Sequence, residues 1–401
     1  MKQLAHALPL VLTIAAVGCA PVKTGVVTIA STPSDPRPRA PKGNLRAQII
    51  ARARVWEPTT VSAADIKAGP PAPNGFAFGQ TVECTWFKKD MSGKSPKFAC
   101  KMGADDELKV KYGGGNGEVY AEVAATRLLW ALGFGADRMY PVKVICHDCP
   151  ANLSGSTRSE HEMIFDPATI ERKLPGVPFE EDKGWSWAEL DSVDEAAGGA
   201  TRAQRDALKL LAVFMQHTDT KSQQQRLLCL DETATSTGAT ASRTTAPATT
   251  TAATAPKTTT ATKDASAPLE CTHPLMILND VGLTFGRANT FNDNTKGGMN
   301  LARWSKTPVW KSSKGCVGNL PKSMTGTLND PAISEAGRKF LADLLMQLSD
   351  AQIHDLFEVS RAELRLRDPG DVNSGYPTLD EWVTAFKEKR DQIVTRSCSA
   401  T

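Results

Sequence analysis

The chain has 401 residues, and its 47 lysines and arginines nearly balance 44 aspartates and glutamates, giving a formal net charge of +3. Basic residues are scattered without any run of five. This charge pattern argues against nucleic acid as a partner. The length is sufficient for two packed lobes, even after low-complexity segments are set aside.

Residues 1–18 are predicted to be an export signal. Lys2 precedes an apolar run that ends at Val17, and this run is too short to cross a membrane as a helix. The small residues before Cys19 resemble a bacterial lipobox, in which Cys19 would become the lipidated N-terminus. Cleavage by an ordinary signal peptidase nearby is the alternative.

Residues 19–50 are predicted to be a lipid-anchored tether, because four prolines between 33 and 41 favour an extended spacer. We therefore expect the protein in the periplasm or at the cell surface, attached to the lipid membrane through its N-terminus. Ala20, where an aspartate would signal retention at the inner membrane, favours the outer membrane by the same resemblance.

Eight cysteines remain once Cys19 is set aside, and an even number in an exported chain favours disulfides. Eight cysteines allow 105 pairings, so spacing alone does not fix the connectivity. Our expected pairs are Cys84–Cys100, Cys229–Cys271, Cys316–Cys398 and the local pair Cys146–Cys149. A zinc half-site is the alternative for the last pair.

The first half of the chain is predicted to form strands around one main helix. Residues 81–88, 97–101 and 107–112 have strand-like patterns, and a polar turn at 91–95 joins the first two. A helix is expected from Glu118 to Leu132, followed by an apolar, β-branched strand at 138–146.

The second half is predicted to be mainly helical around one strand pair. Thr201 can cap a helix that runs through Gln216, and further helices are expected within 334–358 and 378–396. Apolar strands at 226–230 and 274–279 flank the tract 232–268. That tract is almost wholly Thr, Ala, Ser and Pro, so we expect it to be disordered.

Two short acidic motifs flank this tract. The first is His217-Thr218-Asp219-Thr220-Lys221, with Gln224 three residues later, and the second is Asn279-Asp280-Val281-Gly282. Phosphoryl transfer needs one carboxylate to accept a hydroxyl proton, and a carboxylate plus an amide to hold a divalent cation on the phosphates. The two motifs contain all three groups.

The order of elements and motifs resembles the protein-kinase fold, and more closely its atypical exported branch. The resemblance covers about 81–290 and includes the helix segment Ala121-Glu122-Val123-Ala124-Ala125. It implies an α+β, bilobal kinase-like fold, in which a small antiparallel β lobe with one main helix precedes a larger, mainly helical lobe. The N-terminal lobe would occupy 51–150 and the C-terminal lobe 151–401.

The resemblance also implies roles for the acidic motifs. Asp219 would accept the proton of the attacking hydroxyl, and Lys221 would neutralise charge on the transferred group. Asp280 would bind the metal, with Gly282 allowing the backbone turn. Gln224 occupies the place of the metal-binding asparagine, a departure that puts the metal geometry in doubt.

Further residues would hold the nucleotide in the same comparison. Lys111 would reach the phosphates and pair with Glu122, while Lys109 and Glu118 are the alternatives for this pair. The glycine-rich signature of kinases is absent from the sequence. The hairpin tip that contains Gly93 and Lys94 takes the position of that glycine-rich loop, and Lys94 or Lys97 could cover the phosphates.

We therefore expect an exported kinase-like lipoprotein that uses ATP, or another nucleotide, with Mg²⁺ or Mn²⁺. Its acceptor would be a hydroxyl group on an envelope protein, a glycan or a small molecule. A pseudokinase that uses the same cleft for binding or scaffolding is the alternative. A purely structural envelope lipoprotein is the third possibility, and it predicts no nucleotide binding.

Overall fold

The computed structural model describes residues 45–72, 74–150, 153, 162–230, 271–286 and 298–398. The expected signal peptide, Cys19 and the tract 232–268 lie outside these residues. The predicted end of the extended tether at residue 50 was wrong, because helix α1 (Leu45–Ala51) already forms within that range. Ile49 and Ile50 are buried in the core, and this burial favours a packed helix at the end of the proline-rich segment.

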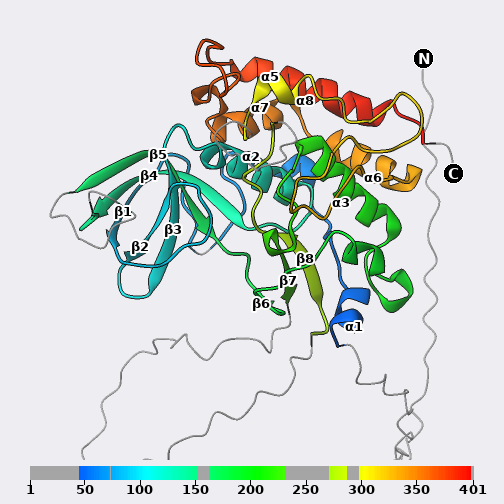
Figure 1. Cartoon of the computed structure of the whole chain (residues 1–401), viewed down its shortest axis with the longest axis horizontal. Coiled ribbons are helices and arrows are strands. Elements are labelled where there is room, and N and C mark those ends of the chain that lie inside the picture. Colours follow the sequence, from blue (N-terminus) through cyan, green and yellow to red (C-terminus); the bar gives the residue numbers. More distant parts are fainter. Residues whose placement is uncertain are drawn as a thin grey trace, which may run out of the picture. The chain divides into compact units, whose positions relative to one another are not determined.

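Five strands form a small closed barrel in the order β1-β2-β3-β5-β4 (Figure 1). Their pairings are antiparallel except that β1 and β4 run parallel and close the barrel. The expected β region with one main helix is thus confirmed, with one parallel pairing that we did not predict. The elements are β1 (Thr81–Trp86), β2 (Lys97–Met102), β3 (Asp106–Tyr112), α2 (Glu118–Ala131), β4 (Arg138–His147) and β5 (Met163–Arg172).

Strand β5 extends this sheet past residue 150, where the sequence suggested that the second lobe begins. It pairs with both β3 and β4. Its sequence contains Asp166, Pro167 and Glu171, which interrupt the apolar alternation that marks a strand. Pairing on both sides therefore holds a strand that the local pattern does not predict.

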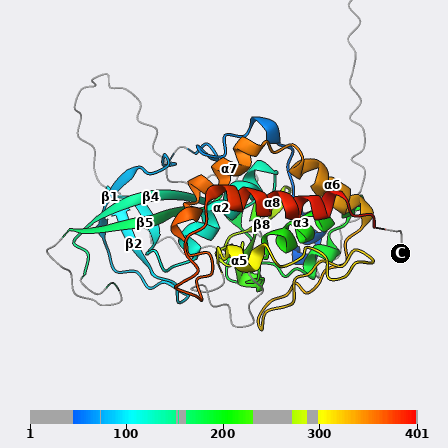
Figure 2. The same cartoon turned by 90° about the horizontal axis from the view of Figure 1, so that it is seen from above.

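The rest of the described chain is mainly helical, as expected, around a three-stranded sheet (Figures 1 and 2). The predicted strand pair around the tract is confirmed as antiparallel β7 and β8. The elements are β6 (Val177–Pro178), α3 (Arg202–Met215), β7 (Gln225–Cys229), β8 (Pro274–Leu278), α5 (Leu301–Trp304), α6 (Glu335–Leu345), α7 (Asp350–Val359) and α8 (Leu379–Val394). Short 3₁₀ turns lie at Val61–Ala63, Glu189–Ser192, Glu195–Ala197, Ser222–Gln224 and Ala362–Leu364.

Helix α2 connects the barrel to the helical region. Twelve of its side chains are buried, all except Glu118 and Trp130. In the helical region, α7 and α8 pack through aromatic side chains, and the rings of Phe357 and Trp382 stack with their centroids 5.1 Å apart. A helix buried on almost every side has little freedom to shift, so its carboxylates are held in place.

All four expected disulfides are present. They join Cys84 to Cys100, Cys146 to Cys149, Cys229 to Cys271 and Cys316 to Cys398. Four disulfides in one chain are typical of an oxidising compartment. Within the described residues, no helix is both long and apolar enough to span a membrane.

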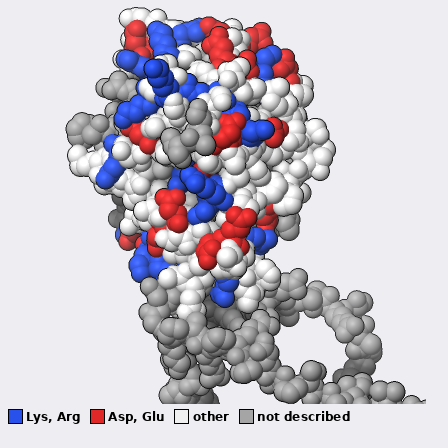
Figure 3. Space-filling view, turned by 90° about the vertical axis from the view of Figure 1, so that its right-hand side faces the viewer, with Lys and Arg blue, Asp and Glu red and all other residues white. Residues whose placement is uncertain are grey.

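The face shown in Figure 3 carries basic and acidic side chains in alternation. No broad basic area stands out among the described residues on that face. This distribution agrees with the near-neutral charge of the sequence.

Replacing Thr378 with alanine should lower the free energy of unfolding by about 1 kcal/mol. Thr378 begins α8 with a capping box, in which its hydroxyl accepts from the amide of Glu381 and the Glu381 carboxylate accepts from the Thr378 amide. Urea unfolding of both proteins measures the change. Thr378→Ser keeps the hydroxyl and serves as the control; an equal loss in that variant would contradict the cap as the cause.

Candidate functional site

A cleft of about 1250 Å³ lies between the barrel and the loops that precede β7 and follow β8. Nearly every residue that the motifs singled out faces it. The cleft is lined by Gly93, Lys94, Lys109, Lys111, Glu118, Asp219, Lys221, Gln224 and Asp280, and Glu122 lies directly behind Lys111. Residues from four separate segments of the sequence thus meet in one place.

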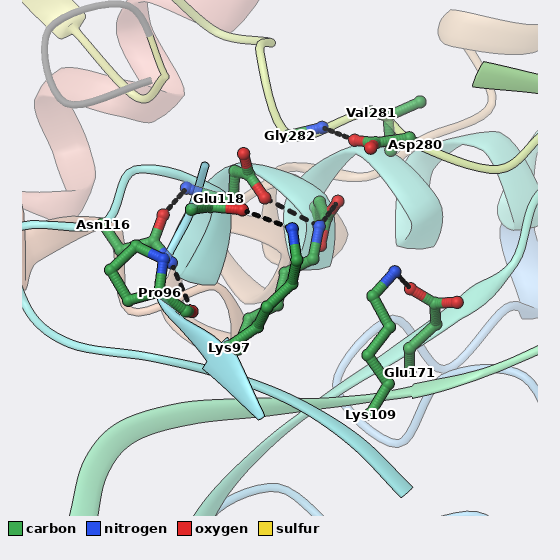
Figure 4. A network of polar contacts seen from close by, with 12 residues as sticks. Pro96, Lys97, Lys109, Asn116, Glu118, Glu171, Asp280, Val281 and Gly282 are labelled. Carbon is green, nitrogen blue, oxygen red and sulfur yellow. Dashed lines mark hydrogen bonds and ion pairs between the residues drawn. The ribbon is translucent and has the colours of Figure 1, made fainter. Parts of the chain in front are cut away.

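Lys111 is the centre of the site. It is 1% exposed on β3, and its ammonium donates to Glu122 Oε1 at 2.5 Å and to Glu118 Oε2 at 2.7 Å (Figure 4 shows this network). Burial lowers the pKa of Lys111, but the neighbouring carboxylates of Glu122, Asp280 and Glu118 outweigh burial and hold it above its usual value. The lysine is therefore charged and aimed by α2.

The alternatives for this pair take other positions. Lys109 forms its ion pair with Glu171 on β5, and not with α2. Glu118 does contact Lys111, one helical turn before Glu122. The structure therefore places Lys111 in contact with both candidate glutamates. Lys109 lines the cleft as a second cation but pairs with Glu171.

Asp219 lies in the loop that follows α3, four residues after its last residue Met215, and is 8% exposed. Gln224 donates its amide to Asp219 Oδ2 at 2.7 Å, and Lys221 approaches the same oxygen at 3.3 Å. The backbone carbonyl of Gln224 accepts from the amides of Asn279 and Asp280 at 3.0 and 3.3 Å. These bonds join the two acidic motifs, which the β7–β8 pair brings together.

Asp280 is half-buried and ionised. Burial raises its pKa, but the nearby ammonium groups of Lys111 and Lys109 lower it to about 2. Glu122 behaves in the opposite way, because complete burial and the Asp280 carboxylate raise its pKa well above the usual value. The pKa values of the two carboxyl groups at this site are thus shifted in opposite directions, while Glu122 stays in contact with the Lys111 ammonium.

A divalent cation fits this arrangement. Glu118, Glu122 and Asp280 each offer a carboxylate oxygen, and these three atoms lie within 4.8 Å of one another. Glu122 Oε2 is buried without a hydrogen-bond partner among the described residues. Carboxylate oxygens are the ligands that Mg²⁺ and Mn²⁺ prefer. The sequence pointed to Asp280 and Gln224 for this role and assigned no metal role to the two glutamates.

Gly282 serves the site in a way that the sequence did not indicate. We expected it to allow a backbone turn, but it is absent from the described glycines with positive φ. A Cβ at this position would lie 2.4 Å from Glu118 Cγ. The glycine instead makes room for the carboxylate side chain of Glu118 beside Asp280.

Sequence reasoning missed a second charged pair, Asp137 with Arg226, at the back of the cleft. Both side chains line the cleft, form an ion pair, and are buried. The backbone amide of Leu174 also donates to Asp137 at 2.8 Å. The partners lie 89 positions apart, and neither belongs to a motif, so nothing in the sequence connects them.

His217, the first residue of the acidic motif, does not face the cleft. It is fully buried, and both ring nitrogens lack a hydrogen-bond partner within the part of the chain that the structure describes. Burial lowers its pKa to about 4, so the ring is neutral. It packs near Trp187, at 6.4 Å between ring centroids, as a core residue.

No protein-family model matches the chain, and no curated protein matches it. Among solved structures, the chain is similar to the crystal structure of a Helicobacter pylori proinflammatory kinase, CtkA. The two share 10% sequence identity and a TM-score of 0.37, and the similarity covers 76% of this chain and 91% of that chain.

Proposed function

We propose that the protein is an exported kinase-like phosphotransferase that binds a nucleotide and a divalent cation in the cleft. One observation carries this proposal. A buried lysine on the third strand is fixed by a glutamate of the following helix, and it faces two aspartates that come from separate loops. Phosphoryl transfer relies on such a constellation for positioning and for neutralising charge.

The chain's own residues have distinct tasks in this proposal. Lys111 binds phosphate oxygens, and Glu122 keeps its ammonium in position. Asp219 accepts the proton of the acceptor hydroxyl, while Gln224 and Lys221 orient its carboxylate. Asp280, Glu118 and Glu122 would hold Mg²⁺ or Mn²⁺, with the amide oxygen of Gln224 as a further candidate ligand. The cation supplies neutralisation of charge on the phosphates.

The cellular setting belongs to the same proposal. The disulfides fit an oxidising compartment, and the lipobox-like segment before Cys19 would anchor the protein in a membrane of the cell envelope. The acceptor is then a hydroxyl group on an envelope protein, a glycan or a small molecule.

Nucleotide with Mg²⁺ or Mn²⁺ should raise the thermal stability of the full chain with its disulfides intact. Ligand at 100 times its Kd stabilises the native state by about 2.7 kcal/mol, which is readily measured as a shift in Tm. Asp280→Asn should lose the shift, because the cation loses a charged ligand. Asp343→Asn, an exposed change on α6, is the control.

No shift with ATP or GTP and either cation would contradict the proposal. A shift that Asp280→Asn retains would place the ligand elsewhere. The same titration addresses the second candidate, a pseudokinase, which the glutamine at position 224 favours. A pseudokinase would bind nucleotide but would transfer no labelled phosphate to envelope extracts, and Asp219→Asn would then change nothing.

A further inference from the structure

The strands β2 and β3 place a further lysine, Lys97, on the cleft wall beside Lys109 and Lys111, and the proposed function gives it no role. Lys97 is the first residue of β2 and lies directly across from Lys111 in the antiparallel β2–β3 pair. Residues that face each other in such a pair point to the same side of the sheet. Phe98 and Val110, their chain neighbours, point to the other side and pack in the barrel core. Lys97 and Lys111 are therefore neighbours on the cleft face.

Lys97 differs from the other two lysines in its partners. Lys111 is paired with Glu118 and Glu122, and Lys109 is paired with Glu171. Lys97 forms no ion pair with any described carboxylate, and its ammonium donates only to Ser95 Oγ at 3.3 Å. It is half-buried, and burial together with Lys111 lowers its pKa by more than the carboxylates of Glu118 and Asp280 raise it. A half-buried cation beside another cation is unfavourable unless an anion joins them.

The ammonium of Lys97 also lies beneath the tip of the β1–β2 hairpin. A Cβ at Gly93 would be 2.8 Å from Lys97 Nζ. The tip residues Ser92, Gly93 and Lys94 line the cleft together with Lys97 and with Glu118, the first residue of α2. An anion held by Lys97 would thus be covered by the hairpin and would be near Lys111.

We infer that Lys97 binds the terminal phosphate of the nucleotide. The co-substrate is then a nucleoside triphosphate that is bound by the cross-strand pair of Lys97 and Lys111. This inference rests on the proposed function. Phosphate oxygens accept charge-assisted hydrogen bonds from both ammonium groups and remove the repulsion between them. Lys111 is held by α2, whereas Lys97 is free to follow the phosphate that is transferred.

The test measures equilibrium binding to the full chain in the presence of Mg²⁺. The ligands are the nucleoside triphosphate, the nucleoside diphosphate and the nucleoside of one base, adenine or guanine, whichever binds more tightly. Lys97→Met should weaken triphosphate binding by about 10- to 100-fold, the scale of one charge-assisted contact. Diphosphate binding should fall less, and nucleoside binding should not change. Lys97→Arg should recover most of the affinity. Lys88→Met, an exposed lysine outside the cleft lining, is the matched control.

An unchanged triphosphate affinity in Lys97→Met would overturn the inference while leaving the proposed function intact. An equal loss for the nucleoside would also overturn it, because the effect would not depend on phosphate. If the unaltered protein binds no nucleotide, the proposed function fails, and this inference fails with it. Should Lys97→Met fold poorly, Lys97→Gln provides the same comparison with a polar side chain.

Discussion

Replacing Lys389 with methionine is expected to stabilise the protein at pH 7 and to remove part of its pH dependence above neutrality. Lys389 on α8 is 0% exposed. Its ammonium donates to the carbonyl of Thr307 at 2.6 Å, its one hydrogen bond to the described residues, and lies over the ring of Trp304. Burial lowers the pKa of Lys389 from its usual 10.5 to about 7. The shift of the pKa means that burying this amine costs roughly 4–5 kcal/mol at pH 7 relative to an exposed lysine.

The sign of the pH dependence follows from this lowered pKa. Between about pH 7 and 10.5 the unfolded chain binds more protons at Lys389 than the folded chain does. Stability therefore rises with pH across this window, by up to about 1.4 kcal/mol per pH unit. Below about pH 7 both states carry the proton, and this lysine adds no slope.

Urea unfolding at pH 7, 8 and 9 measures the effect. Methionine fills the space of the lysine stem but leaves the Thr307 carbonyl without its hydrogen-bond partner. This loss offsets about 1–2 kcal/mol of the stabilisation. The net stabilisation at pH 7 should be about 2–3 kcal/mol and should shrink as the pH rises. Lys339→Met, an exposed change on α6, should leave the curve unaltered. Parallel pH curves for Lys389→Met and the unaltered protein would show that the buried amine stays charged.

The sequence was most informative where a local pattern was regular. The alternation over 107–112 and the helical spacing after Glu118 predicted β3 and α2 almost to the residue. It was least informative where the fold depends on distant partners. Strand β5 has a proline and charged residues in its interior, and the parallel closure of β1 on β4 has no local signal. Proximity to a proline-rich segment similarly concealed the buried face of α1.

The cleft residues were likewise predicted where a local motif exists and were left undecided where their position depends on distant strands. Motif spacing singled out Asp219, Asp280 and Lys111, and the structure brings all three to one cleft. It left the choice between Lys109 and Lys111 open, since both lie on one strand face. The structure separates them through Glu171, a residue of the strand that was not predicted. Long-range pairing, and not residue type, decided which lysine faces α2.

The largest loss of stability is expected from replacing Lys111 with methionine. Lys111 is a buried cation in contact with two glutamates and close to Asp280. Removing one partner of a buried pair leaves uncompensated charge and costs about 3–5 kcal/mol. Urea unfolding in the presence of a chelator measures this loss. Lys109→Met is the control, because Lys109 is more exposed and contacts one carboxylate; it should cost about 1 kcal/mol or less.

A double-mutant cycle with Glu122→Gln separates the ion pair from the lost volume of the lysine. The two changes together should cost less than the sum of the single changes, by about 2 kcal/mol or more, because the double variant lacks the unpaired buried carboxylate. Strict additivity would mean that Lys111 acts through packing alone. Adding Mn²⁺ in place of the chelator should then recover part of the loss in Lys111→Met but not in the double variant. Such recovery would show that the three carboxylates accept a divalent cation once the lysine no longer neutralises them, which ties the stability of the site to the chemistry proposed for it.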